Sequence, residues 1–351
     1  MRKYLISVLV IAFTVSMLFI GCKEEVAEAV EEAAPTEEVA EEEVVVEDET
    51  AVAEDTSPFI GSEEEVYWMS TFISGHPFWK KVYAGFVDAA NALGVTSEYG
   101  GGAEFELTSC VAAFEQIAAG MPAGIAVTCM NAPGYIQSIN MVMDAGVNVV
   151  TFDADSPLSN RLAFLGTGNF AAGAVAARHM AELIGGKGQV ATIRAFGLGN
   201  AEDRRGGFVW AIEQEYPDIE IVAEVDTEGD NVTGAANFAP VLVQYPDLVG
   251  VFGADGAGGL SAAVPIKEAG KTGTIKVVVF DTDTPVLDMI KTGEIDATMV
   301  QGLYNMGFWS MTFLYVAKHE ISGAPLPSNV DTGVTVLTAD NPNFDDFYYD
   351  E

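Results

Sequence analysis

Three aspartates and one glutamine each close an apolar run of strand length. They are Asp153, Asp255, Asp281 and Gln301, at the ends of the runs 149–153, 251–255, 277–281 and 298–301. The carboxyl ends of parallel strands share one edge of a sheet, and open α/β folds bind ligands at that edge. Carboxylates and amides hold pairs of hydroxyls, so the pattern predicts a site for a polyol. Any single aspartate there could instead cap the next helix.

Two adjacent aromatic residues lie where a strand gives way to a helix. Residues 66–71 form an apolar run rich in β-branched and aromatic side chains, and residues 74–76 have turn chemistry. Pro77 suits the first turn of a helix, where its missing N–H costs nothing. Phe78 and Trp79 then follow the strand end, where they could stack on the apolar face of a sugar. The alternative is that one ring packs into the core while the other covers its edge.

An arginine pair, Arg204 and Arg205, lies near the start of another expected helix. Cations are disfavoured at a helix N-terminus because the helix dipole is positive there. At least one of the two arginines should therefore have a partner, either a ligand oxygen or one of the three aspartates. The other can be solvated.

These residues lie on a chain that alternates strand and helix from Glu65 onwards. The expected strands are 66–71, 95–99, 124–129, 147–153, 161–166, 190–195, 220–225, 249–255, 276–281 and 295–301. The expected helices after the first are 105–119, 134–145, 170–184, 201–215, 232–243, 260–269, 285–291 and 305–319. Regular alternation predicts an α/β fold whose parallel sheets are covered by helices on both faces. We expect two sheets, because this many parallel strands would be exceptional in one.

The chain has 351 residues and a formal net charge of −36. Residues 23–63 hold 16 Asp and Glu against one Lys. They lack the apolar surface to fold, so they predict a disordered acidic tether; a helix there is the alternative, although no caps support it. The rest of the chain is also acidic. This charge argues against nucleic acid as a partner and against docking on anionic lipid.

Residues 1–22 have the form of an export signal. A basic start precedes the apolar stretch 5–20, and Gly21 and Cys22 follow at once. The small residue before Cys22 makes the segment similar to a bacterial lipoprotein signal, which implies lipidation of Cys22 after cleavage. Such signals prefer a leucine at the position that Phe19 occupies here, whereas Leu18 lies one residue further from Cys22. The alternative is an uncleaved membrane anchor, for which the apolar run is slightly short.

Two further cysteines, Cys110 and Cys129, are expected near the same sheet edge. They could pair in an oxidising compartment, or remain unpaired thiols in the core. The sequence shows no metal-ligand spacing, so we expect no metal.

From about residue 65 to residue 340 the sequence resembles the ribose- and galactose-binding class of periplasmic binding proteins, which serve ABC importers. The shared segments are 76–79 (HPFW), 152–153 (FD), 165–168 (LGTG), 204–208 (RRGGF), 251–255 (VFGAD), 280–281 (FD) and Gln301. No one segment is specific, but their order and spacing together are. The resemblance implies two Rossmann-like lobes with parallel sheets and a three-crossover hinge, the type I architecture.

The resemblance also divides the chain. After the signal 1–22 and the tether 23–63, the N-terminal lobe would comprise 64–166 plus 302–328, and the C-terminal lobe 167–301 plus 329–351. The crossovers would fall near 166–168, after Gln301 and near Ser328.

The family's motifs imply roles for single residues. Phe78 and Trp79 would stack on the sugar, and His76 occupies a polar binding position in the same loop. Hydrogen bonds to the ligand would come from Asp153, Arg204, Asp255, Asp281 and Gln301, with Asn131 a weaker candidate.

Departures from the family pattern make ribose doubtful as the ligand. Ala154 stands where ribose binders have arginine, and Gly229 stands where they have an aromatic residue near 228–230. The calcium loop of the galactose binders has no match, although Asp226, Glu228 and Asp230 have suggestive spacing.

The resemblance implies a monomeric lipoprotein on a periplasmic or cell-surface face that binds a neutral sugar or polyol and delivers it to an ABC permease. One alternative is a sensor for a chemoreceptor or kinase, and another is a sugar-acid binder that uses Arg204 and Arg205 together. We expect no enzyme, because His76, His179 and His319 have no nucleophile or metal ligands around them. We expect no cofactor, because the glycines of 166–173 miss the dinucleotide spacing by one residue.

Overall fold

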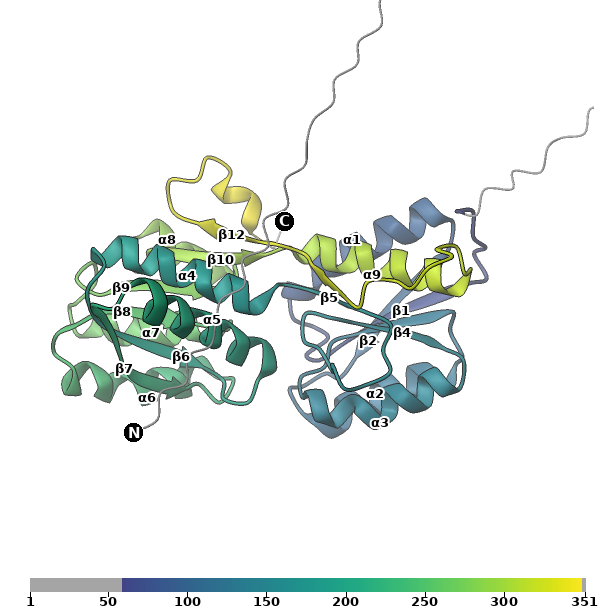
Figure 1. Ribbon diagram of the computed structural model, residues 1–351, viewed down its shortest axis with the longest axis horizontal. Coiled ribbons are helices and arrows are strands. Elements are labelled where there is room, and N and C mark those ends of the chain that lie inside the picture. The colour runs from purple at the N-terminus through teal and green to yellow at the C-terminus, as the bar shows by residue number, and fades with distance from the viewer. Residues whose placement is uncertain (1–58, 349–351) are drawn as a thin grey trace, which may run out of the picture. The chain divides into compact units, whose positions relative to one another are not determined.

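The computed structural model describes residues 59–348, which form two six-stranded sheets with alternating helices (Figure 1). The strand orders are β11-β5-β4-β3-β1-β2 and β12-β10-β9-β8-β6-β7. Strand pairs are parallel, except that β12 runs antiparallel to β10. The two sheets confirm the predicted α/β class. The predicted signal, Cys22 and residues 23–58 of the predicted tether lie outside the described residues.

The first lobe contains a sheet built around β1 (Val66–Thr71), and helices cover both faces of this sheet. Its other elements are α1 (Phe78–Leu93), β2 (Thr96–Gly101), α2 (Leu107–Ala119), β3 (Gly124–Val127), α3 (Ala132–Asp144), β4 (Asn148–Phe152), β5 (Phe164–Gly166), α9 (Leu303–Lys318) and β11 (Asn329–Asp331). One buried apolar cluster lies under α1 and α9, and another under α2 and α3. The central strands β3 and β4 are apolar on both faces for this reason.

The second lobe repeats this arrangement. It contains α4 (Asn169–Ile184), β6 (Gly188–Arg194), α5 (Gly199–Glu215), β7 (Ile219–Asp226), α6 (Asn231–Gln244), β8 (Leu248–Gly253), α7 (Gly258–Glu268), β9 (Lys276–Phe280), α8 (Thr284–Lys291), β10 (Ala297–Gln301), β12 (Val334–Leu337) and the 3-10 turn η1 (Phe344–Phe347). Helices α4 and α5 cover one face, and α6, α7 and α8 cover the other. No helix among residues 59–348 is both long enough and apolar enough to cross a membrane.

Glycines let the two helices of one layer touch through their backbones in each lobe. A Cβ on Gly173 of α4 would lie 1.8 Å from the carbonyl oxygen of Arg204, and one on Gly207 of α5 would lie 1.8 Å from that of Phe170. In the first lobe, Gly307 of α9 would meet the carbonyl oxygen of Val82 at 1.8 Å. The α4–α5 contact holds the N-terminal turns of α5, and so Arg204, against α4.

Three crossings connect the lobes. They lie between β5 and α4, between β10 and α9, and between β11 and β12. The third falls slightly later than expected, because β11 pairs with β5 and keeps the first lobe going to Asp331. So short a strand with exposed ends has no clear sequence pattern. Hydrogen bonds join the crossings, from Thr332 N to Gly166 O (2.9 Å) and from Gly302 N to Gly333 O (3.2 Å).

The first lobe begins earlier than the expected end of the tether at residue 63. Gly61 N donates to Leu93 O at 2.7 Å, and Thr96 Oγ1 donates to Glu63 O at 2.7 Å. Residues 61–63 are therefore fastened to the end of α1 and the start of β2. Their acidic composition concealed this backbone pairing.

Helix α2 begins two residues later than predicted. Glu106 is its N-cap, and the carboxylate accepts hydrogen bonds from Thr108 N at 2.9 Å and Ser109 N at 2.7 Å. Phe105 consequently lies in the loop before the helix rather than in its first turn.

Cys110 and Cys129 are both buried and are free thiols. The Sγ of Cys110 donates to the carbonyl oxygen of Glu104 at 3.3 Å. Of the two possibilities left open by the sequence, unpaired core thiols is therefore the one observed.

Candidate ligand-binding site

A cavity of about 320 Å³ lies where strand ends of both lobes face each other. Its volume is in the range of small-molecule sites. Every predicted binding residue except Asn131 lines it: His76, Phe78, Trp79, Asp153, Arg204, Asp255, Asp281 and Gln301. The fold thus brings residues together from segments more than 200 positions apart in the sequence.

Asn131 is the exception. Its exposed side chain caps α3, with Oδ1 accepting a hydrogen bond from Gly134 N at 2.9 Å. The residue is absent from the cavity lining. A cap is the ordinary function of an asparagine directly before a helix.

The aromatic wall of the cavity belongs to the first lobe. Trp79 is only 3% exposed, and its Nε1 donates to Phe72 O at 2.8 Å. Its ring meets those of Phe72, Phe78 and Phe152 edge to face, with centroids 5.2, 4.8 and 6.0 Å away. Phe78 and Trp79 are therefore both core residues and lining residues. Packing in the core and lining the ligand cavity are compatible for this pair, because the two rings lie where the core of the first lobe meets the cavity.

His76 organises the start of α1. Its Nδ1 accepts a hydrogen bond from Phe78 N at 3.2 Å, and its carbonyl oxygen accepts one from Trp79 N at 3.1 Å. Pro77, at the N-cap, offers no side-chain cap of its own. The imidazole thereby satisfies a helix N–H while it lines the cavity.

Arg204 is the buried cation of the site, with an exposed fraction of 1%. Its Nε donates to Asn169 Oδ1 (2.8 Å), its Nη1 to Ala254 O (3.2 Å) and its Nη2 to Gln301 Oε1 (2.7 Å). The guanidinium carbon lies 4.0 Å from the ring centroid of Phe280. These contacts fix the plane of the guanidinium and leave N–H groups that can donate to a ligand.

Asp153 and Asp281 occupy equivalent positions after β4 and β9. Both have positive φ angles, 59° and 72°, which are uncommon for residues other than glycine. Asp153 Oδ2 accepts a hydrogen bond from Thr128 Oγ1 at 3.1 Å, and Asp281 Oδ1 accepts one from Gln301 Nε2 at 2.6 Å. Backbone strain of this kind is concentrated at functional sites.

Burial dominates the electrostatics of the cavity. It raises the pKa of Asp153 to about 6; Arg204 opposes this rise and Asp281 adds to it. Burial also raises the pKa of Asp255 and lowers that of Arg204. Three carboxylates thus face one guanidinium in a region of low polarity. Such a site favours hydrogen-bond donors such as hydroxyls over anions.

Asp255 also binds backbone N–H groups after β6 and at the start of α7. Its Oδ1 accepts a hydrogen bond from Gly258 N at 2.8 Å, and its Oδ2 accepts one from Ala195 N. Asp255 therefore binds the first N–H of α7, whose N-cap is Ala257, while it lines the cavity.

Arg205 does not line the cavity. Its Nη2 donates to Glu224 Oε1, and Glu224 Oε2 accepts a second hydrogen bond from Arg194 Nη1 at 3.0 Å. This geometry contradicts the alternative in which Arg204 and Arg205 bind a sugar acid together.

Several lining residues were not among the predicted binding residues. They lie in the loops after strand ends or in the first turns of the helices that follow these loops: Phe72, Ile73, Leu198, Asn200, Gly229, Asp230, Asn231, Gly256, Ala257 and Asp283. The strand ends were visible in the sequence, but the side chains that turn inward from each loop were not. Asp230 also caps α6, accepting from Thr233 N at 2.7 Å. No cluster of metal-binding side chains occurs in residues 59–348.

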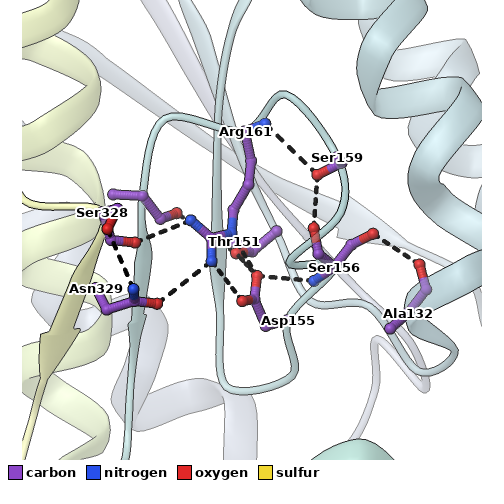
Figure 2. A network of polar contacts seen from close by, with 9 residues as sticks. Ala132, Thr151, Asp155, Ser156, Ser159, Arg161, Ser328 and Asn329 are labelled. Carbon is purple, nitrogen blue, oxygen red and sulfur yellow. Dashed lines mark hydrogen bonds and ion pairs between the residues drawn. The ribbon is translucent and has the colours of Figure 1, made fainter.

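An ion pair fixes the loop that follows Asp153 (Figure 2). Asp155 accepts hydrogen bonds from Arg161 Nε and Nη2, both at 2.5 Å, and from Thr151 Oγ1 at 2.5 Å. Arg161 Nη1 also donates to Ser328 O at 2.9 Å. Arg161 therefore links the loop between β4 and β5 to the segment that precedes β11.

A second cavity, of about 740 Å³, shares Asp153 and Asn200 with the first. Its lining includes Gly166, Gly168 and Asp331, which belong to the crossings between the lobes. The second cavity therefore adjoins the first at Asp153 and extends from there to the crossings between the lobes.

Comparisons with known proteins agree with this geometry. Residues 67–320 match the family described as periplasmic binding protein domain. A sugar-binding protein of a sugar ABC transporter from Bacillus halodurans is 39% identical with a TM-score of 0.77, over 81% of this chain and 100% of that chain. AraP, an arabinose binding protein from Geobacillus stearothermophilus, is 39% identical with a TM-score of 0.76, over 81% and 99%. The D-allose-binding periplasmic protein of Escherichia coli (strain K12) is 26% identical over 282 residues, 78% of this chain and 89% of that protein. The chain belongs to the periplasmic binding protein domain family.

Proposed function

We propose that this protein is an extracytoplasmic solute-binding lipoprotein that captures a neutral sugar or polyol between its lobes and delivers it to an ABC permease. The observation that carries the proposal is the convergence of an aromatic wall from one lobe and a buried Asp–Arg–Gln cluster from the other on one cavity. The sugars named for its relatives, arabinose and D-allose, are of the same class.

Each part of the cavity has a task in this function. Phe78 and Trp79 offer apolar ring faces to the C–H groups of a sugar, while Asp153 and Asp281 accept hydrogen bonds from its hydroxyls. Arg204 donates to a ligand oxygen from a fixed orientation. A ligand that touches both lobes binds the closed arrangement better than the open one, and so shifts the hinge equilibrium towards closure. The closed form is the one that the permease accepts.

The charge balance favours a neutral ligand. Two buried carboxylates, those of Asp153 and Asp255, and the half-buried carboxylate of Asp281 surround one guanidinium that already has protein partners. An anionic sugar would add a further negative charge to a region where negative charge is already costly. Binding uses no cofactor and changes no bond in the ligand.

The lipid anchor is proposed from the sequence before the domain. Gly21 and Cys22 follow the apolar stretch, and the acidic segment after them would hold a monomeric domain away from the membrane. Replacement of Cys22 by serine should release the protein from the membrane fraction and abolish incorporation of labelled fatty acid. Retention of the Cys22→Ser protein in membranes would contradict lipid anchoring.

The ligand class is tested by thermal unfolding and calorimetry. The exported chain, with Cys22→Ser, is titrated with pentoses, hexoses, polyols, inositols and sugar acids after removal of any co-purified ligand. A ligand at a hundred times its dissociation constant should stabilise the protein by about 2.7 kcal/mol. We expect this for a neutral sugar or polyol.

A matched pair of variants locates the binding. Asp281→Asn should lose most of the stabilisation, whereas Asp247→Asn, in the exposed turn before β8 and outside the cavity, should keep it. Stabilisation by sugar acids alone would refute the charge argument. A wild-type response that survives in Asp281→Asn would place the ligand elsewhere.

A further inference from the structure

We propose that Phe105 gates the cavity: its ring, held by the first lobe, covers the mouth of the site and seats against Gly229 of the second lobe. This inference rests on the proposed function, since the gate would retain the captured sugar.

Phe105 is held in place by the start of α2. Glu106 caps that helix through two backbone N–H groups, which fixes the main chain next to Phe105. The Phe105 side chain is nevertheless 44% exposed. A large apolar ring kept in solvent by an ordered backbone is available for a further contact.

The ring of Phe105 continues the aromatic wall of the cavity. The centroids of Phe105 and Phe72 are 5.4 Å apart with the planes at 78°, and Phe72 in turn meets Trp79 at 5.2 Å. Phe72 and Trp79 line the cavity. The three rings therefore lead from the inner wall out to the loop before α2.

The same ring also reaches the second lobe. A Cβ built on Gly229 would lie 3.7 Å from Cε1 and 3.8 Å from Cδ1 of Phe105. Gly229 lines the cavity together with Asp230 and Asn231 and has a φ of +76°. A methyl group at this position would therefore be in ordinary van der Waals contact with the ring, which places Phe105 directly beside the backbone of the opposite loop.

Phe105 thus neighbours one lining residue from each lobe, although it is not itself part of the lining. This is the position of a cover. When a ligand draws the lobes together, the ring is buried between Phe72 and Gly229, and the mouth must open again before the ligand leaves. The contact consequently slows dissociation more than it affects capture.

Stopped-flow measurement of sugar binding to Phe105→Ala tests the gate. We expect the dissociation rate constant to rise about 2- to 12-fold, the range for an aromatic contact, with little change in the association rate constant. Phe105→Leu should recover part of the loss. The melting temperature of the ligand-free protein should change little, because the ring is half exposed.

Trp309→Ala is the matched control. Trp309 is 41% exposed on α9 of the same lobe and lies outside the cavity lining. The Trp309→Ala variant should release sugar at the wild-type rate. An unchanged rate in Phe105→Ala, or an equal rise in Trp309→Ala, would overturn the gate while leaving the proposed function intact. If the wild-type protein bound no sugar or polyol, the proposed function and the gate would both be refuted.

Discussion

Arg204 faces Asp153, Asp255 and Asp281 across a buried site, so each charge there depends on the others. Burial disfavours every charged form, and one guanidinium cannot compensate three carboxylates. Burial raises the pKa of Asp153 to about 6. Ligand hydroxyls that donate to the ionised carboxylates would relieve this imbalance.

Asp153→Asn should flatten the pH dependence of stability. The ordinary pKa of this group is 3.8 and its folded value is about 6, so the folded protein binds more protons than the unfolded protein between these values. The free energy of unfolding therefore falls as pH rises from about 4 to 6. Asparagine does not titrate, so the free energy of unfolding of the variant should fall by about 1–3 kcal/mol less over this pH range than that of the wild type. Urea unfolding at pH 4, 5, 6 and 7 measures it.

Asp144→Asn provides the comparison for this experiment. Asp144 is exposed at the end of α3 in the same lobe. It should keep the wild-type pH profile. Identical profiles for Asp153→Asn and the wild type would show that Asp153 is already ionised at low pH and would refute the raised pKa.

At the scale of elements, the sequence predicted the α/β alternation well because each buried strand is a continuous apolar run. It missed β11 and β12, which are short and partly exposed. It also started α2 at Phe105, because apolar spacing cannot reveal that the Glu106 carboxylate caps the helix. Lining residues of the cavity were predicted at each position where a polar residue closes an apolar run. Phe72, Asn231 and Asp283 were missed because their orientation depends on loop conformation.

The contact between α4 and α5 makes a sharp prediction at this scale. Gly207→Ala should lower the free energy of unfolding by about 1–3 kcal/mol, because its Cβ would lie 1.8 Å from Phe170 O and the helices must separate. Sugar affinity should fall as well, since Arg204 lies one turn away on α5. Urea unfolding and calorimetry measure the two effects.

The neighbouring residue supplies the control. A Cβ on Gly206 would meet nothing closer than 3.8 Å, so Gly206→Ala adds the same methyl group to the same helix without a clash. It should stabilise the protein by about 0.5–1 kcal/mol through helix propensity. Equal destabilisation by both variants would mean that helix contact does not explain the need for glycine.

At the scale of the molecule, the hinge and the ligand site share residues. Gln301 accepts a hydrogen bond from Thr167 Oγ1 at 2.8 Å, and these two residues begin two of the crossings. Asp331, at the third crossing, accepts from Gly168 N at 2.8 Å. The crossings are thus bonded side by side next to Arg204 and Asp281. A ligand that engages Gln301 acts on the segment about which the lobes move.

Gly302→Ala should weaken binding without altering any lining residue. A Cβ on Gly302 would lie 2.1 Å from Thr332 O, so the second and third crossings must move apart. We expect the binding-competent population to fall, which lowers apparent affinity in proportion. Calorimetry gives the affinity, and X-ray scattering with and without saturating sugar gives the change in radius of gyration on closure. Gly206→Ala, away from the crossings, should match the wild type in both. Wild-type affinity and an unaltered scattering change in Gly302→Ala would show that close contact between the crossings is not needed for closure.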